Sequence, residues 1–176
     1  MLSKRAQEKV QDFGSEGERV CYVRLKGPTT SIFIIAVYVP HRGRVAPCQD
    51  DTLQDLENVL RRTPRNDCIC ILGDCNEQLE GNVHGRTGKW VGGLKSKNAD
   101  KIMQLLRLHD LTAVNTFFQP RHGKQVHTYL HTAPQGGNND SDYGEYVGAH
   151  CIAKYKGKQI GGRVKAAYGG KKKRCG

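Results

Sequence analysis

The stretch CICILGDCNE, residues 68–77, places two polar side chains directly after an apolar run. Asp74 is a carboxylate that can orient and deprotonate a water molecule, and Asn76 is a carboxamide that can donate a hydrogen bond to a phosphate oxygen. Hydrolysis of a phosphodiester needs an activated water and groups that neutralise the charge on the phosphate oxygens. Gly-Asp-x-Asn is also good turn chemistry, so the tetrapeptide fits either a strand-ending turn or a phosphodiesterase site.

A phenol and an imidazole close the preceding apolar run, SIFIIAVYVPH. Tyr38 and His41 could contact a phosphate group, although a tyrosine at a strand end is more often a packing residue. Further along, HTYLH at residues 127–131 adds Thr128 between two histidines. No compact cluster of His, Asp and Glu surrounds them, so the spacing predicts no metal ligands here.

Three strands and a helix are predicted to position these side chains. Residues 18–27 alternate between apolar and polar, and residues 31–40 are continuously apolar, which predicts an antiparallel pair whose second strand is fully buried. Apolar residues then recur at helical spacing, which predicts a helix that Asp50 or Asp51 can cap and that Pro64 ends. The stretch DCICILGD follows the helix and is predicted to be another buried strand. The order strand, helix, strand indicates an α/β fold.

The second half of the chain is less regular. Residues 80–97 form a long glycine-rich loop, which is either functional or disordered. A helix is predicted over residues 98–109, a short strand over 111–118 and a further strand over 125–131. A polar, turn-rich stretch then marks a change of composition near residue 140, which predicts a domain over residues 1–140 and a separate segment over 141–176.

The positive charge is concentrated in that last segment. The chain has a net charge of +11, but nine of its 28 basic residues and none of its acids lie after residue 150, which leaves the rest at only +2. Such a tail either binds phosphate backbones without sequence preference or is a solvated end. The candidate phosphate contacts at its extremity are Lys171, Lys172, Lys173 and Arg174.

Composition favours an ordinary intracellular domain. The chain of 176 residues is long enough for a core, and it contains no apolar run long enough to span a membrane. The charged N-terminus does not resemble a secretion signal. Seven cysteines without a CxxC pair predict reduced, mostly buried thiols and not a zinc site. We therefore expect an intracellular location, with the nucleus as one candidate.

Taken in order, these segments resemble the endonuclease/exonuclease/phosphatase superfamily, and within it the apurinic-type endonuclease domains of LINE-type retrotransposons. The resemblance covers residues 2–132 and depends on five stretches, SIFIIAVYVPH, CICILGDCNEQL, GRTGKW, NADKIMQLLRLHDLTAVNTFFQ and HTYLH. It implies part of a four-layer α/β/β/α sandwich, truncated at both ends.

The resemblance also implies roles for single residues. Asp74 would position or deprotonate the attacking water, Asn76 would donate to the transition state, Tyr38 would contact phosphate and Thr128 would support the site. His41 stands where relatives often carry Asn, so its role as a substrate contact is open. Cys75 stands where Phe is usual, which is a change of packing.

The departures from the family pattern concern the metal and the proton. Relatives hold a catalytic Mg²⁺ through a Glu on an earlier strand, and this chain opens at MLSKRAQEK, which resembles a point past that strand. The family's Ser-Asp-His motif is absent, since Tyr143 follows Ser141 and Asp142. The resemblance therefore implies an impaired Mg²⁺-dependent DNA endonuclease, or alternatively an inactive nucleic-acid-binding module. Its partners would be DNA and the remainder of a longer polyprotein or reverse transcriptase, with no membrane.

The basic segment has a faint resemblance of its own. AKYKGKQIGGRV resembles a hairpin that opens a Tudor-like β-barrel. Tudor barrels bind methylated residues in aromatic cages, for which this segment offers three tyrosines, and we do not predict that activity.

Overall fold

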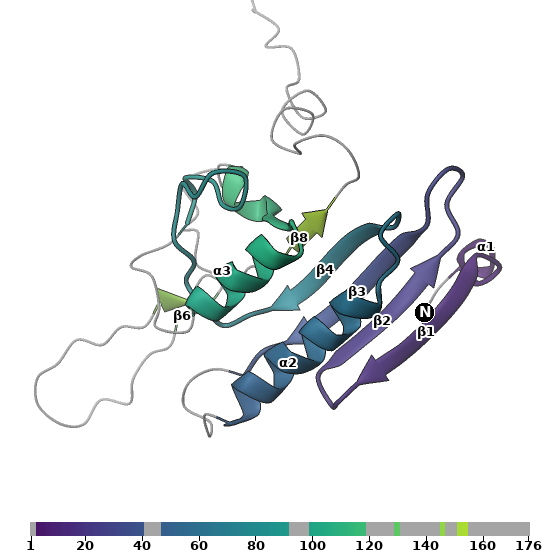
Figure 1. Cartoon of the computed structure of the whole chain (residues 1–176), viewed down its shortest axis with the longest axis horizontal. Helices are drawn as coiled ribbons and strands as arrows, with labels where there is room; N and C mark the ends of the chain where they lie inside the picture. Colours follow the sequence, from purple (N-terminus) through teal and green to yellow (C-terminus); the bar gives the residue numbers. More distant parts are fainter. Residues whose placement is uncertain are drawn as a thin grey trace, which may run out of the picture.

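The computed structural model describes residues 3–40, 47–91, 99–118, 129–130, 145–146 and 151–154 (Figure 1). Its helices and strands follow one another as α1 (Lys4–Gln7), β1 (Val10–Glu16), β2 (Val20–Leu25), β3 (Ile32–Tyr38), α2 (Pro47–Arg62), β4 (Cys68–Asp74), α3 (Ala99–Leu108), β5 (Thr112–Ala113), the 3₁₀ helix η1 (Val114–Phe117), β6 (Tyr129–Leu130), β7 (Glu145–Tyr146) and β8 (Cys151–Lys154).

A six-stranded mixed sheet organises the described residues. Its strand order is β1-β2-β3-β4-β8-β5, and β6 and β7 form a separate two-stranded sheet. β3 and β4 are parallel and joined through α2, whereas β1–β2, β2–β3, β4–β8 and β5–β8 are antiparallel. The α/β class and the antiparallel pairing of the first two predicted strands are therefore confirmed.

β1, which forms one edge of the main sheet, was not predicted from the sequence. Its residues VQDFGSE are too polar for a buried strand, and they pair with β2 through a turn at Gly17, whose φ is +60°. The register shifts between Val10 and Asp12, which is an irregularity typical of sheet edges. A hairpin partner can thus order a segment that has no apolar periodicity of its own.

Both long helices are present where they were predicted, but the start of α2 differs from the expected one. α2 begins at Pro47, so the expected start at Asp50 or Asp51 is wrong; proline suits the first helical position because its missing N–H is not needed there. α3 lies within the predicted range 98–109. Of the strand predicted over residues 111–118, only the two residues of β5 are in a strand, and η1 follows them directly. Within η1, the Thr116 hydroxyl donates to the Ala113 carbonyl at 2.6 Å.

The hydrophobic core lies between one face of the sheet and the two helices (Figure 1). Burial of each such aliphatic side chain contributes about 1.5–3 kcal/mol, so this layer supplies most of the stabilisation. The sheet contributes Val20, Phe33, Ile35, Val37, Ile69 and Ile71, and the helices contribute Leu53, Leu56, Val59, Leu60, Ile102, Met103, Leu105 and Leu106.

The opposite face of the sheet is not covered by any described helix or strand. Burial alternates along β3 and β4, and Ile32 and Leu72 are 40% and 42% exposed. The prediction that both strands are buried on both faces is therefore wrong for this structure. Their continuous apolar sequence is typical of strands that are covered on both faces, but the described helices cover only one face of these two strands.

Candidate functional site

The structure brings Tyr38 and Asp74 together at the carboxyl ends of two adjacent parallel strands. They are register partners in the β3–β4 pair, so their side chains leave the sheet on the same face. This is the uncovered face, and Tyr38 is 50% exposed. A phenol and a carboxylate on neighbouring strands, about 4.8 Å apart at the backbone, can contact one small polar group such as a phosphate.

Gly73 allows this close alignment. Its φ is +155°, and a Cβ atom at this position would collide with the carbonyl oxygen of Val37 on β3. Directly beyond it, the backbone N–H of Val39 donates to the carbonyl of Asp74 at 2.8 Å. Glycine therefore lets β4 follow β3 to the point where Asp74 emerges.

Asn76 both forms the turn after β4 and fixes the position of the Asp74 carboxylate. Its φ is +47°, a left-handed conformation that Asn tolerates better than most residues, and its backbone N–H donates to the Asp74 carboxylate at 2.9 Å. Its side-chain nitrogen donates to the Val39 carbonyl at 2.8 Å. An amide nitrogen carries two hydrogens, so this bond uses half of its donor capacity. Asp74 and Asn76 are thereby fixed against the end of β3.

Cys75 and Glu77 point the other way, into the interior. They are 2% and 1% exposed, and the expected packing role of Cys75 agrees with this burial. Burial, and then the nearby charges of Asp74 and Glu77, raises the pKa of Cys75 to about 12. Its thiol stays neutral and is not a nucleophile. The buried carboxylate of Glu77 was missed by sequence reasoning, although its alternation with Cys75 and Leu79 is a signal for an inward side chain.

Arg19 is a second residue that sequence reasoning missed. The N–H of Tyr38 donates to the Arg19 carbonyl at 3.1 Å, and the neighbouring pair is Val20 with Val37. Arg19 therefore precedes β2 beside Tyr38, on the uncovered side of the sheet. Its guanidinium lies 3.7 Å from the exposed Glu18 carboxylate, a surface pair that contributes little. We call Arg19, Tyr38 and Asp74 the polar row.

The polar row combines a cation, a phenol and a carboxylate at one end of the sheet. Guanidinium groups match the geometry of phosphate oxygens, and the phenol adds a hydrogen-bond donor. The carboxylate can hold a water molecule beside them. The signal that would have revealed Arg19 is the register of the β2–β3 hairpin, which pairs the start of one strand with the end of the other.

The described residues do not by themselves fit a magnesium ion. Among them, no group of three or more His, Cys, Asp and Glu side chains could hold a metal. Mg²⁺ prefers an octahedral set of oxygens from one or two carboxylates, waters and substrate phosphates. Asp74 supplies one carboxylate, and that group already accepts the Asn76 N–H. No chemical step through a metal follows from these residues.

The described part of the glycine-rich loop, residues 80–91, is held by side-chain hydrogen bonds. Thr87 donates to the Glu80 carbonyl at 2.6 Å and accepts from the Val83 N–H at 3.1 Å. The Gly88 N–H donates to the buried Thr116 hydroxyl at 2.7 Å. Within this stretch, the loop is attached to η1 and is not an independent lid.

The other predicted contacts lie outside the described residues. They are His41, Thr128, Lys171, Lys172, Lys173 and Arg174. Within the part of the chain that the structure describes, no helix is both long enough and apolar enough to cross a membrane.

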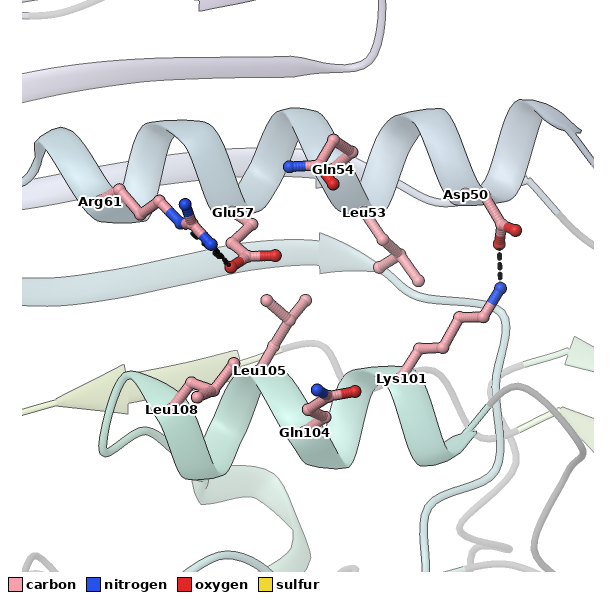
Figure 2. Close-up of a pocket in the computed structure, with 9 residues that line it drawn as sticks. All are labelled: Asp50, Leu53, Gln54, Glu57, Arg61, Lys101, Gln104, Leu105 and Leu108. Carbon is pink, nitrogen blue, oxygen red and sulfur yellow. Dashed lines mark hydrogen bonds and ion pairs between the residues drawn. The ribbon is translucent and has the colours of Figure 1, made fainter.

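A groove between α2 and α3 lies on the opposite, helical side of the sheet from the polar row. It measures about 500 Å³, and Leu53, Leu105 and the exposed Leu108 contribute its apolar lining. Figure 2 shows two ion pairs along it, Asp50 with Lys101 and Glu57 with Arg61. Its charges are paired with each other, and it is separate from the candidate site.

Comparison with known proteins gives two kinds of likeness. No family's sequence profile matches the chain. The chain is 26% identical over 149 residues to craniofacial development protein 2 of Bos taurus, covering 81% of this chain and 24% of that protein. The corresponding protein of Tragulus javanicus is 25% identical over 149 residues. The chain thus spans about a quarter of the length of the curated relatives it matches.

One similar solved structure is an endonuclease/exonuclease/phosphatase family protein from Leptotrichia buccalis. The TM-score is 0.45 at 9% sequence identity, over 77% of this chain and 42% of that one. The fold that the present structure defines by itself is an α/β protein with a mixed sheet, helices on one face and a polar row at one end.

Proposed function

We propose that the polar row and Asn76 form the phosphate-binding end of a domain of the endonuclease/exonuclease/phosphatase type, related to retrotransposon DNA endonucleases. In this chain the site binds the DNA backbone and its hydrolytic step is impaired. The observation that carries the proposal is the register of Tyr38 with Asp74 across two parallel strands, with Arg19 beside them.

Each side chain has a defined task in this proposal. Arg19 attracts a phosphate oxygen, and Tyr38 donates its phenolic hydrogen to the same group. Asp74 holds the attacking water, in a position fixed by the 2.9 Å bond from the Asn76 N–H. The remaining Asn76 side-chain hydrogen can stabilise charge that develops on the phosphate. The order of the five family-like stretches supports the assignment of these roles.

A second candidate, an inactive DNA-binding module, differs only in the absence of turnover. It is favoured by the lack of a three-ligand metal group among the described residues and by the basic segment after residue 150. Magnesium dependence belongs to the endonuclease proposal, in which further ligands would have to come from outside the described residues. The uncovered face of the sheet further supports the proposal of a four-layer sandwich, in which a second sheet packs on that face.

DNA binding tests the polar row directly. Affinity for a short duplex is measured against salt concentration, because each phosphate contact contributes about 0.9 to the slope of log K against log salt. Arg19→Gln should lower the slope by about 0.9, and Tyr38→Phe should weaken binding with an unchanged slope. Arg61→Gln, an exposed arginine on the helical side, is the matched control and should change neither.

The same titration tests the basic segment. Replacing Lys171, Lys172, Lys173 and Arg174 with glutamine should lower the slope by up to about 3.6 if all four contact phosphates. Deleting residues 151–176 is a poorer test, because it would remove β8 from the main sheet. Equal effects of Arg19→Gln and Arg61→Gln would refute the phosphate role of the polar row.

Conversion of supercoiled plasmid DNA to the nicked form separates the two candidates. Nicking that needs Mg²⁺ and falls at least about 100-fold in Asp74→Asn supports the endonuclease. Binding without nicking, unchanged in Asp74→Asn, supports the binding module. Nicking that persists at full rate in Asp74→Asn contradicts the proposed site.

A further inference from the structure

The described part of the glycine-rich loop places a lysine and a tryptophan side by side. The Lys89 ammonium lies 4.8 Å from the centre of the Trp90 ring, and Lys89 is exposed whereas Trp90 is partly buried. Phe117 on η1 is 36% exposed and directly follows Thr116, whose carbonyl accepts the Trp90 N–H at 2.9 Å. We call Lys89, Trp90 and Phe117 the loop patch.

Hydrogen bonds fix the backbone that carries the loop patch. The Gly88 N–H donates to the buried Thr116 hydroxyl at 2.7 Å, and the Asn82 N–H donates to the Gly88 carbonyl at 3.0 Å. A Cβ atom at Gly88 would collide with the Thr116 carbonyl oxygen and with the Cα atom of Phe117. The loop and η1 are therefore packed backbone to backbone. Such a preorganised support lowers the entropic cost of binding a ligand.

The two cations of residues 80–91 differ in how they are held. The Arg86 guanidinium donates to the Asp110 carboxylate at 2.7 Å and to the Leu111 carbonyl at 3.2 Å, so it fastens the loop to the end of α3. Within the part of the chain that the structure describes, Lys89 forms no ion pair, and its ammonium contacts the indole of Trp90. Lys89 can therefore meet an anion without breaking a salt bridge.

A lysine beside an exposed aromatic ring is a combination that binds unpaired nucleotides. Every base has a π face that stacks on an aromatic side chain, and a lysine neutralises the phosphate. Without a ligand, the Lys89 ammonium and the Trp90 ring contact each other through a cation–π interaction. At an exposed site this interaction is weaker than a base stacked on the ring. A nucleotide can thus displace the ammonium from the ring and pair with it through its phosphate.

We propose that the loop patch binds an unpaired nucleotide of DNA, with its base stacked on Trp90 and its phosphate paired with Lys89. Phe117 offers an apolar surface to a neighbouring base. This inference rests on the proposed function as a DNA-binding domain and adds the form of DNA, a single-stranded stretch. Paired bases within a duplex present only their edges to a protein, so their faces are closed to Trp90.

One DNA strand can reach both the loop patch and the polar row. The backbone from Asp74 to Glu80 spans at most about 21 Å, because an extended residue covers at most about 3.5 Å. The Thr87 hydroxyl donates to the Glu80 carbonyl at 2.6 Å, and Trp90 follows Thr87 in the chain. These steps place Trp90 at most about 40 Å from Asp74. A strand of about twelve nucleotides, at 3.4 Å or more each, covers this distance.

Fluorescence of the full chain tests the proposal directly, because Trp90 is its single tryptophan. A single strand of about twelve thymidine nucleotides should quench this fluorescence, because its bases stack on the indole. A blunt duplex should bind without quenching, because its bases are paired. The affinity obtained from quenching should agree with the affinity from anisotropy of a labelled single strand.

Substitutions separate stacking from charge. Trp90→Leu should weaken binding of the single strand about fivefold or more, whereas Trp90→Phe keeps a ring and should keep most of the affinity. Lys89→Gln should lower the slope of log K against log salt by about 0.7, the value for one phosphate contact of a single strand. The matched controls are Phe13→Leu, at a residue 76% exposed on β1, and Lys101→Gln, at a lysine paired with Asp50. Both should leave affinity and slope unchanged.

Three results would overturn the proposal: no quenching by the single strand, equal quenching by the duplex, or equal affinity of folded Trp90→Leu and Trp90→Phe. The polar row is judged separately. Duplex binding that depends on Arg19, without quenching by the single strand, refutes the loop patch alone. Quenching that depends on Lys89, with Arg19→Gln equal to Arg61→Gln in duplex binding, refutes the polar row alone.

Discussion

Gly73→Ala is the substitution that links the fold to the polar row most directly. Gly73 has a φ of +155°, and an added Cβ would collide with the Val37 carbonyl oxygen. The conformational strain alone costs about 1–3 kcal/mol, and relief of the collision requires β3 and β4 to separate. We therefore expect a loss of about 3 kcal/mol or more in the free energy of unfolding. For a domain of this size, this lowers Tm by about 6–12 °C.

Gly85→Ala is the matched control, because it isolates backbone strain from collision. Gly85 has a φ of +69°, but no atom lies within 4 Å of the position that its Cβ would take. Its substitution should cost only about 1–2 kcal/mol. Thermal unfolding by circular dichroism compares the two variants, and DNA affinity should fall in Gly73→Ala alone, since that change moves Asp74 away from Tyr38. Equal destabilisation of the two variants would refute the close approach of the strands at Gly73.

Two further substitutions test the interior. Burial raises the pKa of Cys75 from 9.0 to about 12, so the folded state holds this proton more tightly than the unfolded state does. The corresponding stabilisation is present below pH 9 and is lost as pH rises from 9 toward 12. The free energy of unfolding in urea should therefore fall less steeply with pH over this window in Cys75→Ala than in the unsubstituted protein. Parallel plots of this free energy against pH for the two proteins would contradict the prediction. Leu106→Ala, at a residue 1% exposed, should cost about 2–5 kcal/mol in chemical denaturation, whereas Leu108→Ala, at 62% exposed, should change stability by less than about 0.5 kcal/mol.

Local sequence patterns were sufficient to predict the helices and strands in which apolar residues recur at regular spacing. The apolar spacing in α2 and α3, and the β-branched run of β3, fixed their type and approximate limits because periodicity reflects which face is buried. Proline at position 47 moved the start of α2 ahead of the expected caps. β1 was missed since a hairpin partner, and not its own composition, orders it.

For the candidate site too, some features could be predicted from the sequence and others depended on the tertiary structure. The sequence by itself determined that Asp74 ends a strand, that Asn76 follows in the turn after it, and that Tyr38 ends another strand, because these residues directly continue apolar runs. Tertiary structure alone decided that Tyr38 and Asp74 are neighbours and that Arg19 joins them, since strand register depends on hydrogen bonds between segments distant in the chain. It also decided which face of the sheet is covered. A continuous apolar run is compatible with one covered face or two, and only the packing of α2 and α3 distinguishes them.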